Sequence, residues 1–427
     1  MIKILKYGEV KESEIFSRVV PKVDVRAIVA DIIADVKENG DKALYKYALK
    51  FDKAELSSLR VSNEEIEEAV RVTGEEFLSV LKEAAENITL FHSKQKREGF
   101  KIEKENGVVI GQKVLPVNCA GLYVPGGTAA YPSTVLMDAI PAKIAGCKNV
   151  VMVTPPSADG KVNPAILAAA SVAGVDKIFK VGGAQAVAAL AFGTESIPKA
   201  DKIVGPGNAF VAEAKRQVFG EVSIDMIAGP SEIMILADGK NDPSYLAADM
   251  LSQAEHDKLA TAVMITDSAV LAKAVAEEIE KQLPSLLRCD IAREAIDNNS
   301  KIIVTDDLAS AVDLANDIAP EHLELCLDEP FEMLEKIENA GSVFLGRNCP
   351  EALGDYFAGP NHTLPTSGTA KFSSPLSVDD FVKKMQFTYF TKEALDEVAD
   401  KVAAFAEKEG LTAHARSAVI RSEDKNE

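Results

Sequence analysis

The histidines of this chain stand beside residues of the kinds that bind metals or move protons. The sequence has five histidines in 427 residues. Four of them lie within constellations of polar side chains, and only His92 does not: His256, His322, His362 and His414. Imidazole is the commonest nitrogen ligand of zinc and the usual proton shuttle near neutral pH. The pattern favours a metal-dependent active site; the alternative for any one of them is a histidine bonded only to its neighbours in the fold.

One group of these residues could form a metal site. Gln253 and His256 are three residues apart in a predicted helix after Asp242-Pro243, so both side chains would project from one face. Asp355, in a predicted glycine-flanked loop, and His414 would complete a set of nitrogen and oxygen donors. Such a set suits zinc and also accepts manganese or cobalt, whereas structural zinc sites are normally built on cysteines. A polar pair on a solvated helix face is the alternative.

A second group could act as an acid/base pair. Glu321 and His322 are adjacent, and neighbours on a regular helix do not face the same point. Ala319-Pro320 before them disfavours a helix, so a turn could aim both side chains into one cleft. A carboxylate and an imidazole placed on one substrate each accelerate proton transfer about 10²–10⁴-fold.

Three glycine-rich segments lie where a strand is expected to lead into a helix. They are residues 121–128, residues 181–185 and Gly205-Pro206-Gly207-Asn208. Glycines at such a turn let the main chain approach a phosphate, and the following helix offers unpaired N–H groups. None has the spacing GxGxxG, and no convincing acidic residue follows about twenty positions on to bind a ribose. A nucleotide site and tight turns without a ligand both stay open.

The elements that position these residues alternate between β-rich and alanine-rich runs. The first 95 or so residues are predicted to be helical, with a capped start at 62–65. Strands are then expected at residues 121–124, 150–154, 177–181, 202–204, 233–237, 262–266 and 301–304. Their alternation with helices predicts an α/β fold with a mostly parallel sheet, in two Rossmann-like sets of about 121–230 and 231–350 with a cleft between them.

Two further segments stand outside that alternation. Asn106-Gly107 predicts a hairpin turn after a basic, solvated helix end. The end of the chain, from about Ser377, carries a predicted helix with Val398, Val402 and Phe405 on one side. This C-terminal segment is too small to have its own core, so we expect it to pack on something else.

Composition excludes several classes of protein. The formal net charge of -19 disfavours nucleic acid and anionic lipid as partners. No stretch reaches the roughly 18 apolar residues that a membrane span needs, and the start lacks a secretion signal, so we expect a cytoplasmic protein. The cysteines form no close pair and are expected to be reduced thiols that pack: Cys119, Cys147, Cys289, Cys326 and Cys349.

Taken together, these motifs resemble the histidinol dehydrogenase family. The resemblance runs in order over most of the chain, from the Tyr123 loop to His414. Its segments are 205–210, 228–232, 252–256, 320–322, 341–346, 361–366 and 411–414. It implies oxidation of L-histidinol to L-histidine, the last step of histidine biosynthesis, in two hydride transfers to NAD through an enzyme-held aldehyde.

The resemblance also implies roles for single residues. Those that look like zinc ligands are Gln253, His256, Asp355 and His414. Glu321 and His322 look like the acid/base pair, in which His322 takes the alcohol proton and Glu321 activates the water that hydrates the aldehyde. Tyr123, Gln185 and Asn208 look like NAD contacts. The implied substrate contacts are Ser231 and Glu409, together with His322 and the four zinc ligands.

The domains expected from the sequence follow this reading. They are a segment of residues 1–20, a first Rossmann-like domain of 21–122 with 234–376 that includes the helical N-terminal part, a second, NAD-contacting Rossmann-like domain of 123–233, and a C-terminal tail of 377–427. The resemblance implies a homodimer in which this tail completes the partner's active site.

Three other functions are compatible with parts of the pattern. A zinc hydrolase would use a metal with Glu321 and His322, but it leaves the glycine-rich strand ends unexplained and no HExxH is present. A metal-binding scaffold would bind zinc without NAD dependence. A related zinc- and NAD-dependent dehydrogenase would act on another small amino or hydroxy alcohol.

Overall fold

The computed structural model describes residues 1–18, 24–126 and 130–423. The chain forms two compact units, one of residues 1–95 with 117–381 and one of residues 96–116 with 382–427. The first unit contains two parallel sheets and the second contains one antiparallel sheet. Each unit is described by itself.

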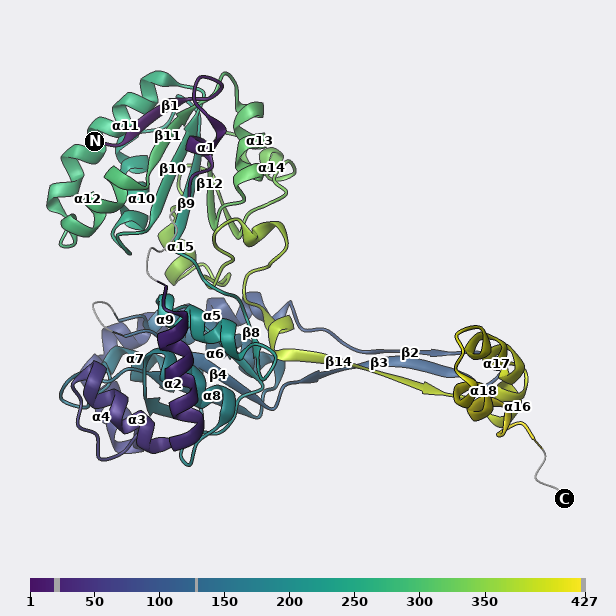
Figure 1. The fold of residues 1–427 in the computed structure, drawn as a ribbon. Coiled ribbons are helices and arrows are strands. Elements are labelled where there is room, and N and C mark those ends of the chain that lie inside the picture. Colours follow the sequence, from purple (N-terminus) through teal and green to yellow (C-terminus); the bar gives the residue numbers. More distant parts are fainter. Residues whose placement is uncertain (19–23, 127–129, 424–427) are drawn as a thin grey trace. The chain divides into compact units, whose positions relative to one another are not determined.

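The first sheet has six parallel strands. In spatial order they are β1 (Lys3–Lys6), β11 (Lys301–Val304), β10 (Thr261–Thr266), β9 (Glu232–Ala237), β12 (His322–Cys326) and β13 (Ser342–Leu345). Alternate residues of β9 face opposite sides, so Ile233 packs in one core and Met234 in the other. One core is covered by α10 (Pro243–Ala254), α11 (Ala269–Gln282) and α12 (Cys289–Asn298), the other by α13 (Leu308–Ile318) and α14 (Pro330–Leu334) (Figure 1).

The second sheet has five parallel strands. In spatial order they are β6 (Lys177–Lys180), β5 (Asn149–Thr154), β4 (Cys119–Tyr123), β7 (Lys202–Val204) and β8 (Ser223–Ile224). Its helices are α6 (Pro132–Ala145) and α7 (Pro164–Ala173) in one core, and α8 (Gly183–Phe192) and α9 (Ala209–Val218) in the other. The two βα sets expected from the sequence are thereby confirmed, and so are the seven strands predicted for them.

The N-terminal helices pack against the second sheet, whereas the expected domains grouped them with the first. They are α2 (Arg26–Asn39), α3 (Asp41–Tyr47), α4 (Asn63–Thr73) and α5 (Glu75–Ser93). Their buried residues share cores with the second sheet, as Val29 does with Leu190 and Leu81 with Leu122. The grouping of 21–122 with 234–376 is corrected accordingly, because an apolar stripe predicts that a helix is buried but not against which sheet.

The start of α4 agrees with the sequence: Ser62 and Glu65 form a capping box. The N-terminal segment differs from its expectation, since β1 is the edge strand of the first sheet. The remaining short elements of this unit are α1 (Glu12–Ile15), η1 (Ala48–Asp52), η2 (Leu283–Ser285), α15 (Glu351–Tyr356), η3 (Thr369–Lys371) and η4 (Val378–Phe381).

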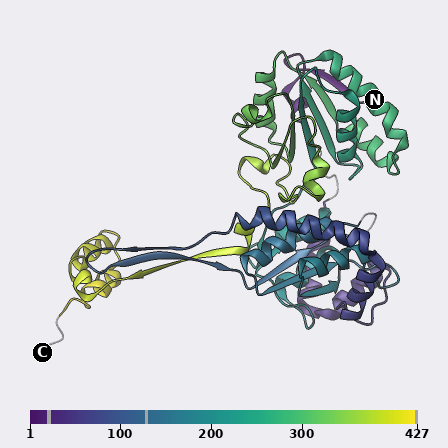
Figure 2. The same ribbon diagram turned by 180° about the vertical axis from the view of Figure 1, so that it is seen from behind.

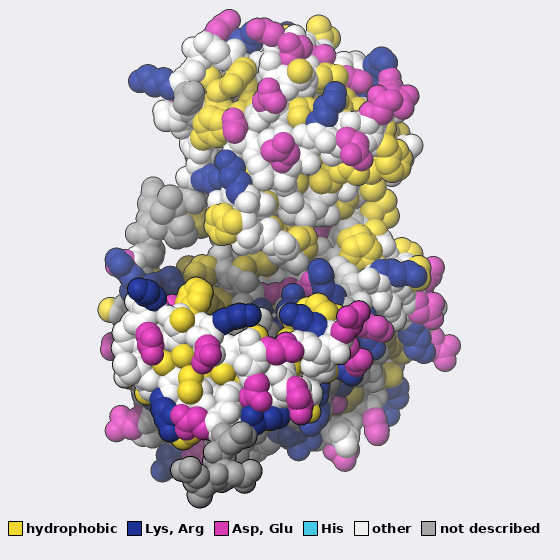
Figure 3. All heavy atoms as spheres, turned by 90° about the vertical axis from the view of Figure 1, so that its right-hand side faces the viewer, with side chains coloured by type: hydrophobic (Ala, Val, Ile, Leu, Met, Phe, Trp, Pro, Cys, Tyr) yellow, Lys and Arg dark blue, Asp and Glu magenta, His cyan; other side chains and the backbone are white. Residues whose placement is uncertain are grey.

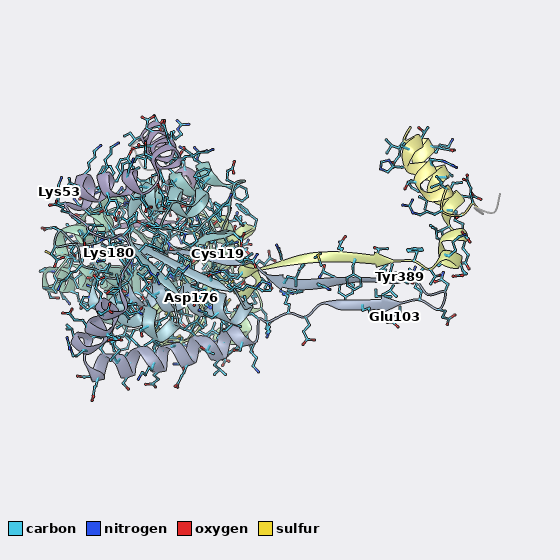
Figure 4. The ribbon with its side chains drawn as sticks, turned by 90° about the horizontal axis from the view of Figure 1, so that it is seen from below. Lys53, Glu103, Cys119, Asp176, Lys180 and Tyr389 are labelled. Carbon is cyan, nitrogen blue, oxygen red and sulfur yellow. The ribbon has the colours of Figure 1, made fainter. Side chains whose placement is uncertain are left out.

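The second unit is a three-stranded antiparallel sheet followed by helices. Its strands lie in the order β14 (Val382–Tyr389), β3 (Val109–Pro116) and β2 (Phe100–Glu103), and the β2–β3 connection contains the predicted turn at Asn106-Gly107. Glu103 and Tyr389 both pair with Val109 and mark the same end of the sheet (Figure 4). The helices are α16 (Lys392–Asp396), α17 (Ala399–Lys408) and α18 (Thr412–Val419) (Figure 2).

Among the residues that the structure describes, only small side chains are buried between the helices of this unit. Helix α17 contacts α18 through Ala403, Ala406 and Ala415. The larger apolar side chains of the predicted stripe are exposed in the single chain: Val402 is 45% exposed and Phe405 is 75% exposed. The apolar face that the sequence predicts for α17 is therefore not covered within this unit.

Acidic and basic side chains are interspersed on the face drawn in Figure 3, and basic residues do not gather into one patch there. Among the helices that the structure describes, none is both long and apolar enough to cross a membrane.

Candidate active site

Glu321 and His322 lie together at the amino ends of two neighbouring strands. His322 begins β12 and Glu232 begins β9, and the two strands pair in parallel. The Oε2 atom of Glu321 accepts a hydrogen bond from the main-chain N–H of Glu232 at 2.7 Å. The ring atom Nδ1 of His322 bonds the carbonyl oxygen of Glu232 at 2.9 Å. The main chain of one residue thus holds both members of the expected acid/base pair.

A turn brings the pair together, as the sequence predicted. Helix α13 ends at Ile318. The next residue is Ala319, whose φ of 51° is left-handed, and Pro320 follows. The N–H of Gly341 donates to the carbonyl of Pro320 at 2.9 Å. A Cβ atom on Gly341 would lie 2.5 Å from the carbonyl oxygen of Glu321. Only glycine allows the main chain before β13 to pass this close to the turn that contains Glu321.

Hydrogen bonding decides which nitrogen of His322 carries the proton. A carbonyl oxygen only accepts, so Nδ1 is the donor and Nε2 keeps its lone pair in the neutral ring. Nε2 is buried and has no hydrogen-bond partner among the described residues. Burial lowers the pKa of His322 and raises that of Glu321 well above its usual range. The site combines a neutral imidazole with a carboxyl group that holds a proton readily.

Gln253 and His256 come from the end of α10 but not from one helix face. The helix ends at Ala254, so His256 lies in the following turn, where its N–H donates to the carbonyl of Gln253 at 3.2 Å. This corrects the predicted arrangement on one helix. Gln253 is fully buried, and both atoms of its amide group lack partners in the described part of the chain. Desolvation is the main cause that lowers the pKa of His322. Asp355 and the bond to Glu232 raise it, and the nearby His256 lowers it by a smaller amount.

Asp355 lies on a short helix, α15, and not in a loop as predicted. Pro350 lies just before the first helical residue, where proline favours the start of a helix, whereas the nearby glycine had suggested a loop. Oδ1 of Asp355 is 3.8 Å from Nε2 of His322. Its carbonyl bonds Nδ1 of His362 at 2.9 Å, and Nε2 of His362 bonds the hydroxyl of Thr134 at 3.1 Å. Asp355 is therefore in reach of both histidines.

The sequence reasoning missed Glu351, which is the first residue of α15. It is 1% exposed, and neither carboxyl oxygen has a hydrogen-bond partner within the described residues. Oε1 lies 3.6 Å from Nδ1 of His322. Single donor atoms of His322, Glu351 and Asp355 lie within 4.8 Å of one another, so this group could hold a metal ion. The spacing of four residues between Glu351 and Asp355 is the signal that could have shown it.

The expected NAD contacts surround the carboxyl ends of the second sheet. The strand order reverses between β4 and β7: β5 and β6 lie beyond β4 on one side, and β8 lies beyond β7 on the other. Tyr123 ends β4, and its hydroxyl accepts from the N–H of Gly183 at 3.0 Å. Gln185 is buried in the first turn of α8, and Asn208 caps α9 through the N–H groups of Phe210 and Val211. Parallel sheets bind ligands at such a reversal of the strand order.

The loop after β7 explains one glycine of its motif. A Cβ atom on Gly205 would lie 2.1 Å from the carbonyl oxygen of Tyr123 and 2.9 Å from Oδ2 of Asp138. Its φ of 111° also requires glycine. The first glycine-rich segment is described only in part, because Gly127 and Thr128 lie outside the described residues.

The segment that contains His362 joins the two groups of residues. Besides the bond from His362 to Thr134, the amide of Asn361 donates to the carbonyl of Met137 at 2.7 Å. The hydroxyl of Thr363 donates to Asp138 at 3.1 Å. Thr134, Met137 and Asp138 all belong to α6, which follows β4. This segment thus connects Asp355 of α15 with α6, the helix that follows β4, through direct hydrogen bonds.

Comparisons with known proteins decide the family. A family model described as histidinol dehydrogenase matches residues 17–422. The chain belongs to the histidinol dehydrogenase family. It is 54% identical over 426 residues to histidinol dehydrogenase of Clostridium acetobutylicum, with 99% of each chain covered. It is 56% identical over 398 residues to histidinol dehydrogenase of Listeria innocua, with 93% of each covered.

A solved structure supports the fold in the same way. The crystal structure of histidinol dehydrogenase from Elizabethkingia anophelis matches with a TM-score of 0.93 and 41% identity, over 98% of each chain. The family resemblance drawn from the motifs is confirmed, and the chain is an oxidoreductase.

The other residues expected in a histidinol dehydrogenase site are divided between the two units. Ser231 lies directly before Glu232 at the amino end of β9, and its carbonyl accepts from the N–H of Thr261 at 3.0 Å. Glu409 and His414 belong to the second unit, at the end of α17 and in α18, and both are exposed in the single chain. The structure therefore does not bring Glu409 and His414 together with Glu321 within the first unit.

The cysteines behave as the sequence predicted. All five are free thiols. Burial raises the pKa of Cys119 to about 11 and that of Cys147 to about 12. Such thiols are poor nucleophiles near neutral pH, which agrees with a packing role.

Proposed function

We propose that this chain oxidises L-histidinol to L-histidine in two successive NAD-dependent hydride transfers, with histidinaldehyde held on the enzyme between them. The chain is a histidinol dehydrogenase, an oxidoreductase that converts histidinol to histidine in histidine biosynthesis. The observation that carries the mechanism is His322, whose Nδ1–H is engaged by the Glu232 carbonyl while Nε2 is unpartnered among the described residues.

His322 acts as the base in the first oxidation. With Nδ1–H bonded, Nε2 has the lone pair that accepts the hydroxyl proton as the alcohol carbon loses its hydride. The hydrogen bond to the Glu232 carbonyl keeps the ring in this orientation and remains available when the ring becomes positively charged. The products of this step are the aldehyde, one reduced cofactor and one proton on His322.

Glu321 acts on water between the two oxidations. Its carboxylate takes a proton from a water molecule as the oxygen adds to the aldehyde carbon. Protonated His322 gives its proton to the aldehyde oxygen, which yields the hydrate and returns His322 to its neutral form. Burial raises the pKa of Glu321, so its ionised form is a stronger base than a solvated carboxylate. The hydrate then loses a second hydride, with His322 again the base, and becomes the carboxylic acid.

The proposed zinc ligands are Gln253, His256, Asp355 and His414. The unpartnered, fully buried amide of Gln253 fits a ligand role, because a buried amide without a partner is costly. Asp355 also belongs to the cluster with His322 and Glu351, so it is common to both possible donor sets. A zinc ion held by these residues would supply a Lewis acid that orients the substrate.

The remaining residues that we propose for the site contact either the cofactor or the substrate. Tyr123, Gln185 and Asn208 would contact NAD, which accepts one hydride in each oxidation. Ser231, His322 and Glu409 would contact the substrate together with the four ligands. We place this reaction in the cytoplasm, where a biosynthetic oxidation has access to the NAD pool.

We further propose a homodimer in which Glu409 and His414 of each chain complete the partner's site. The exposed apolar face of α17 supports such a partner for the second unit. Glu321→Ala chains mixed with His414→Ala chains should recover activity, because one of the two sites in a heterodimer then has every residue intact. Absence of recovery in verified heterodimers would contradict the exchange.

The reaction itself is tested by stoichiometry. Zinc-loaded enzyme receives limiting L-histidinol and excess NAD, and NADH formed per histidinol consumed is measured. A ratio of two supports the coupled oxidation. A ratio of one means that the aldehyde is released, and no NADH with zinc confirmed points to another substrate.

A further inference from the structure

Glu232 is the common support of the acid/base pair. Its N–H holds Glu321 and its carbonyl holds His322, at 2.7 and 2.9 Å. Both bonds are made by the main chain, so any displacement of this residue moves the two side chains relative to each other. The position of Glu232 therefore determines the geometry on which the proposed mechanism depends.

The side chain of Glu232 is held by Arg18. Glu232 is 8% exposed. Nε of Arg18 lies 3.0 Å from its Oε1, and Nη2 lies 3.4 Å from its Oε2. The main-chain N–H of Ser367 bonds the same carboxylate. A planar guanidinium that faces both oxygens fixes the direction of a carboxylate more closely than a single charge does.

Arg18 also binds the chain that leads to the pair. Its Nη2 donates to the carbonyl of Ile318 at 2.5 Å. Ile318 is the last residue of α13 and lies three positions before Glu321. A Cβ atom on Gly368 would lie 2.4 Å from Nη1 of Arg18, so the guanidinium is closely packed against this turn as well. One side chain thus connects the start of β9 with the α13–β12 turn.

We propose that Arg18 is a positioning residue of the reaction, which sets the separation of Glu321 and His322 through Glu232 and Ile318. This inference rests on the proposed catalytic roles of Glu321 and His322. It assigns a function to the segment before α2, which the sequence alone left without one.

The surroundings of Arg18 allow a direct test by chemical rescue. A pocket beside the ion pair is lined in part by Ser17, Arg18, Glu232, Thr261 and Pro320. In Arg18→Ala, the space of the missing side chain would add to this pocket. A free guanidinium ion can then enter and bond the Glu232 carboxylate, whereas a sodium ion offers no N–H groups.

The experiment compares full-length, zinc-loaded wild type and Arg18→Ala in histidinol oxidation. We expect kcat to fall about 10- to 100-fold, with KM for histidinol and for NAD nearly unchanged, because the pair is displaced while the binding residues stay in place. Guanidinium chloride should restore part of kcat in a saturable manner, and sodium chloride should not. Arg18→Lys should recover less than guanidinium, since one ammonium cannot face both oxygens in the same geometry.

Arg293→Ala is the matched control. Arg293 makes a two-bond ion pair with Glu280 at 2.8 Å, from α12 to α11 of the same sheet layer. We expect an unchanged kcat and no response to guanidinium.

A second variant separates positioning from stability. In Arg18→Ala with Glu232→Gln, no carboxylate is left buried without a counter-ion, so the melting temperature should recover while kcat stays low. The inference is overturned if kcat recovers together with stability, if guanidinium rescue fails, or if Arg18→Ala keeps wild-type kcat. Glu321→Ala and His322→Asn are assayed in parallel: wild-type activity in these would instead refute the proposed catalytic roles.

Discussion

The two parallel sheets of the first unit carry their candidate functional residues at opposite ends of their strands. In the second sheet, Tyr123 and the Gly205 loop follow β4 and β7, at the carboxyl ends. In the first sheet, Glu232 and His322 begin β9 and β12, at the amino ends. In each sheet the strand order reverses at this pair of strands. The strand order alone therefore does not tell which end of the first sheet's strands holds the candidate site.

The two ends of the first sheet's strands differ in whether their polar side chains have hydrogen-bond partners. At the carboxyl end of the first sheet, Arg347 bonds Asp238 at 2.9 Å, Asp328 at 2.6 Å and the carbonyl of Cys326 at 2.5 Å. At the amino end, Gln253, His322 and Glu351 are buried with unpartnered atoms among the described residues. An edge whose polar groups are already paired has little to offer a ligand, whereas unpaired buried groups are costly unless a ligand completes them.

The largest expected effect concerns the base at the amino edge. His322→Asn removes Nε2, the proposed proton acceptor, and should lower kcat about 10²–10⁴-fold in steady-state NADH formation. His92→Asn is the control, because His92 is also buried but lies outside this site. Its Nδ1 bonds the side chain of Gln95 at a distance of 2.7 Å. Equal losses of kcat per folded molecule in both variants would mean that the amino edge is not where the chemistry occurs.

A glycine at each edge gives the next comparison. Gly341→Ala places a Cβ atom 2.5 Å from the Glu321 carbonyl and should displace the catalytic turn, with a loss in kcat of about 10²-fold. Gly239→Ala, at the carboxyl edge, meets only the Ser268 side chain at 3.2 Å and should leave kcat unchanged. Circular dichroism and kinetics on both variants measure this, and a similar kcat in the two would contradict the asymmetry.

The carboxyl end of the first sheet, where Arg347 pairs the polar groups, should matter for stability and not for turnover. Arg347→Met removes the bonds to Asp238, Asp328 and the Cys326 carbonyl and should cost about 1–2 kcal/mol in urea unfolding, with kcat unchanged. Lys240→Met, which loses only an exposed pair with Asp328, should cost less stability than Arg347→Met. A fall in kcat for Arg347→Met would show that this edge takes part in the reaction.

The smallest effect is a pH dependence near the ligand edge of the second sheet. Burial raises the pKa of Asp52 from 3.8 to about 6 in the folded protein. The folded state therefore holds this proton more tightly than the unfolded state, and stability falls as pH rises from about 4 through about 6. Asp52→Asn removes this dependence and should raise the melting temperature at pH 8 by about a few degrees, with no gain at pH 4.

Asp35→Asn should change stability with the opposite sign. A hydrogen bond from Lys46, with others from Tyr47 and Asn39, lowers the pKa of Asp35 to about 2, so its ionised form stabilises the fold above pH 4. This variant should melt lower than wild type at pH 8 and approach it toward pH 2. A stabilised Asp35→Asn or a destabilised Asp52→Asn at pH 8 would contradict the signs.

Much of the fold could be predicted from local patterns. Strands such as β9 and β10 have uninterrupted apolar runs, and Ser62 with Glu65 forms the predicted cap. The turn at Glu321 followed from Pro320. Three positions were misjudged: His256 lies beyond its helix, Asp355 lies on one, and the helices of 26–93 cover the second sheet. Each error concerns where an element ends or what it packs against, which depends on distant residues.

The sequence by itself determined the kinds of donor, the alternation of strands and helices, and the family resemblance, because these depend on residue type and local spacing. Only the tertiary structure decided that the amino edge of the first sheet holds Glu321 and His322, that Nε2 of His322 has the free lone pair, and that Glu351 and Arg18 stand beside them. The physical reason is that main-chain hydrogen bonds between distant strands and the burial of charged groups exist only after the chain has folded.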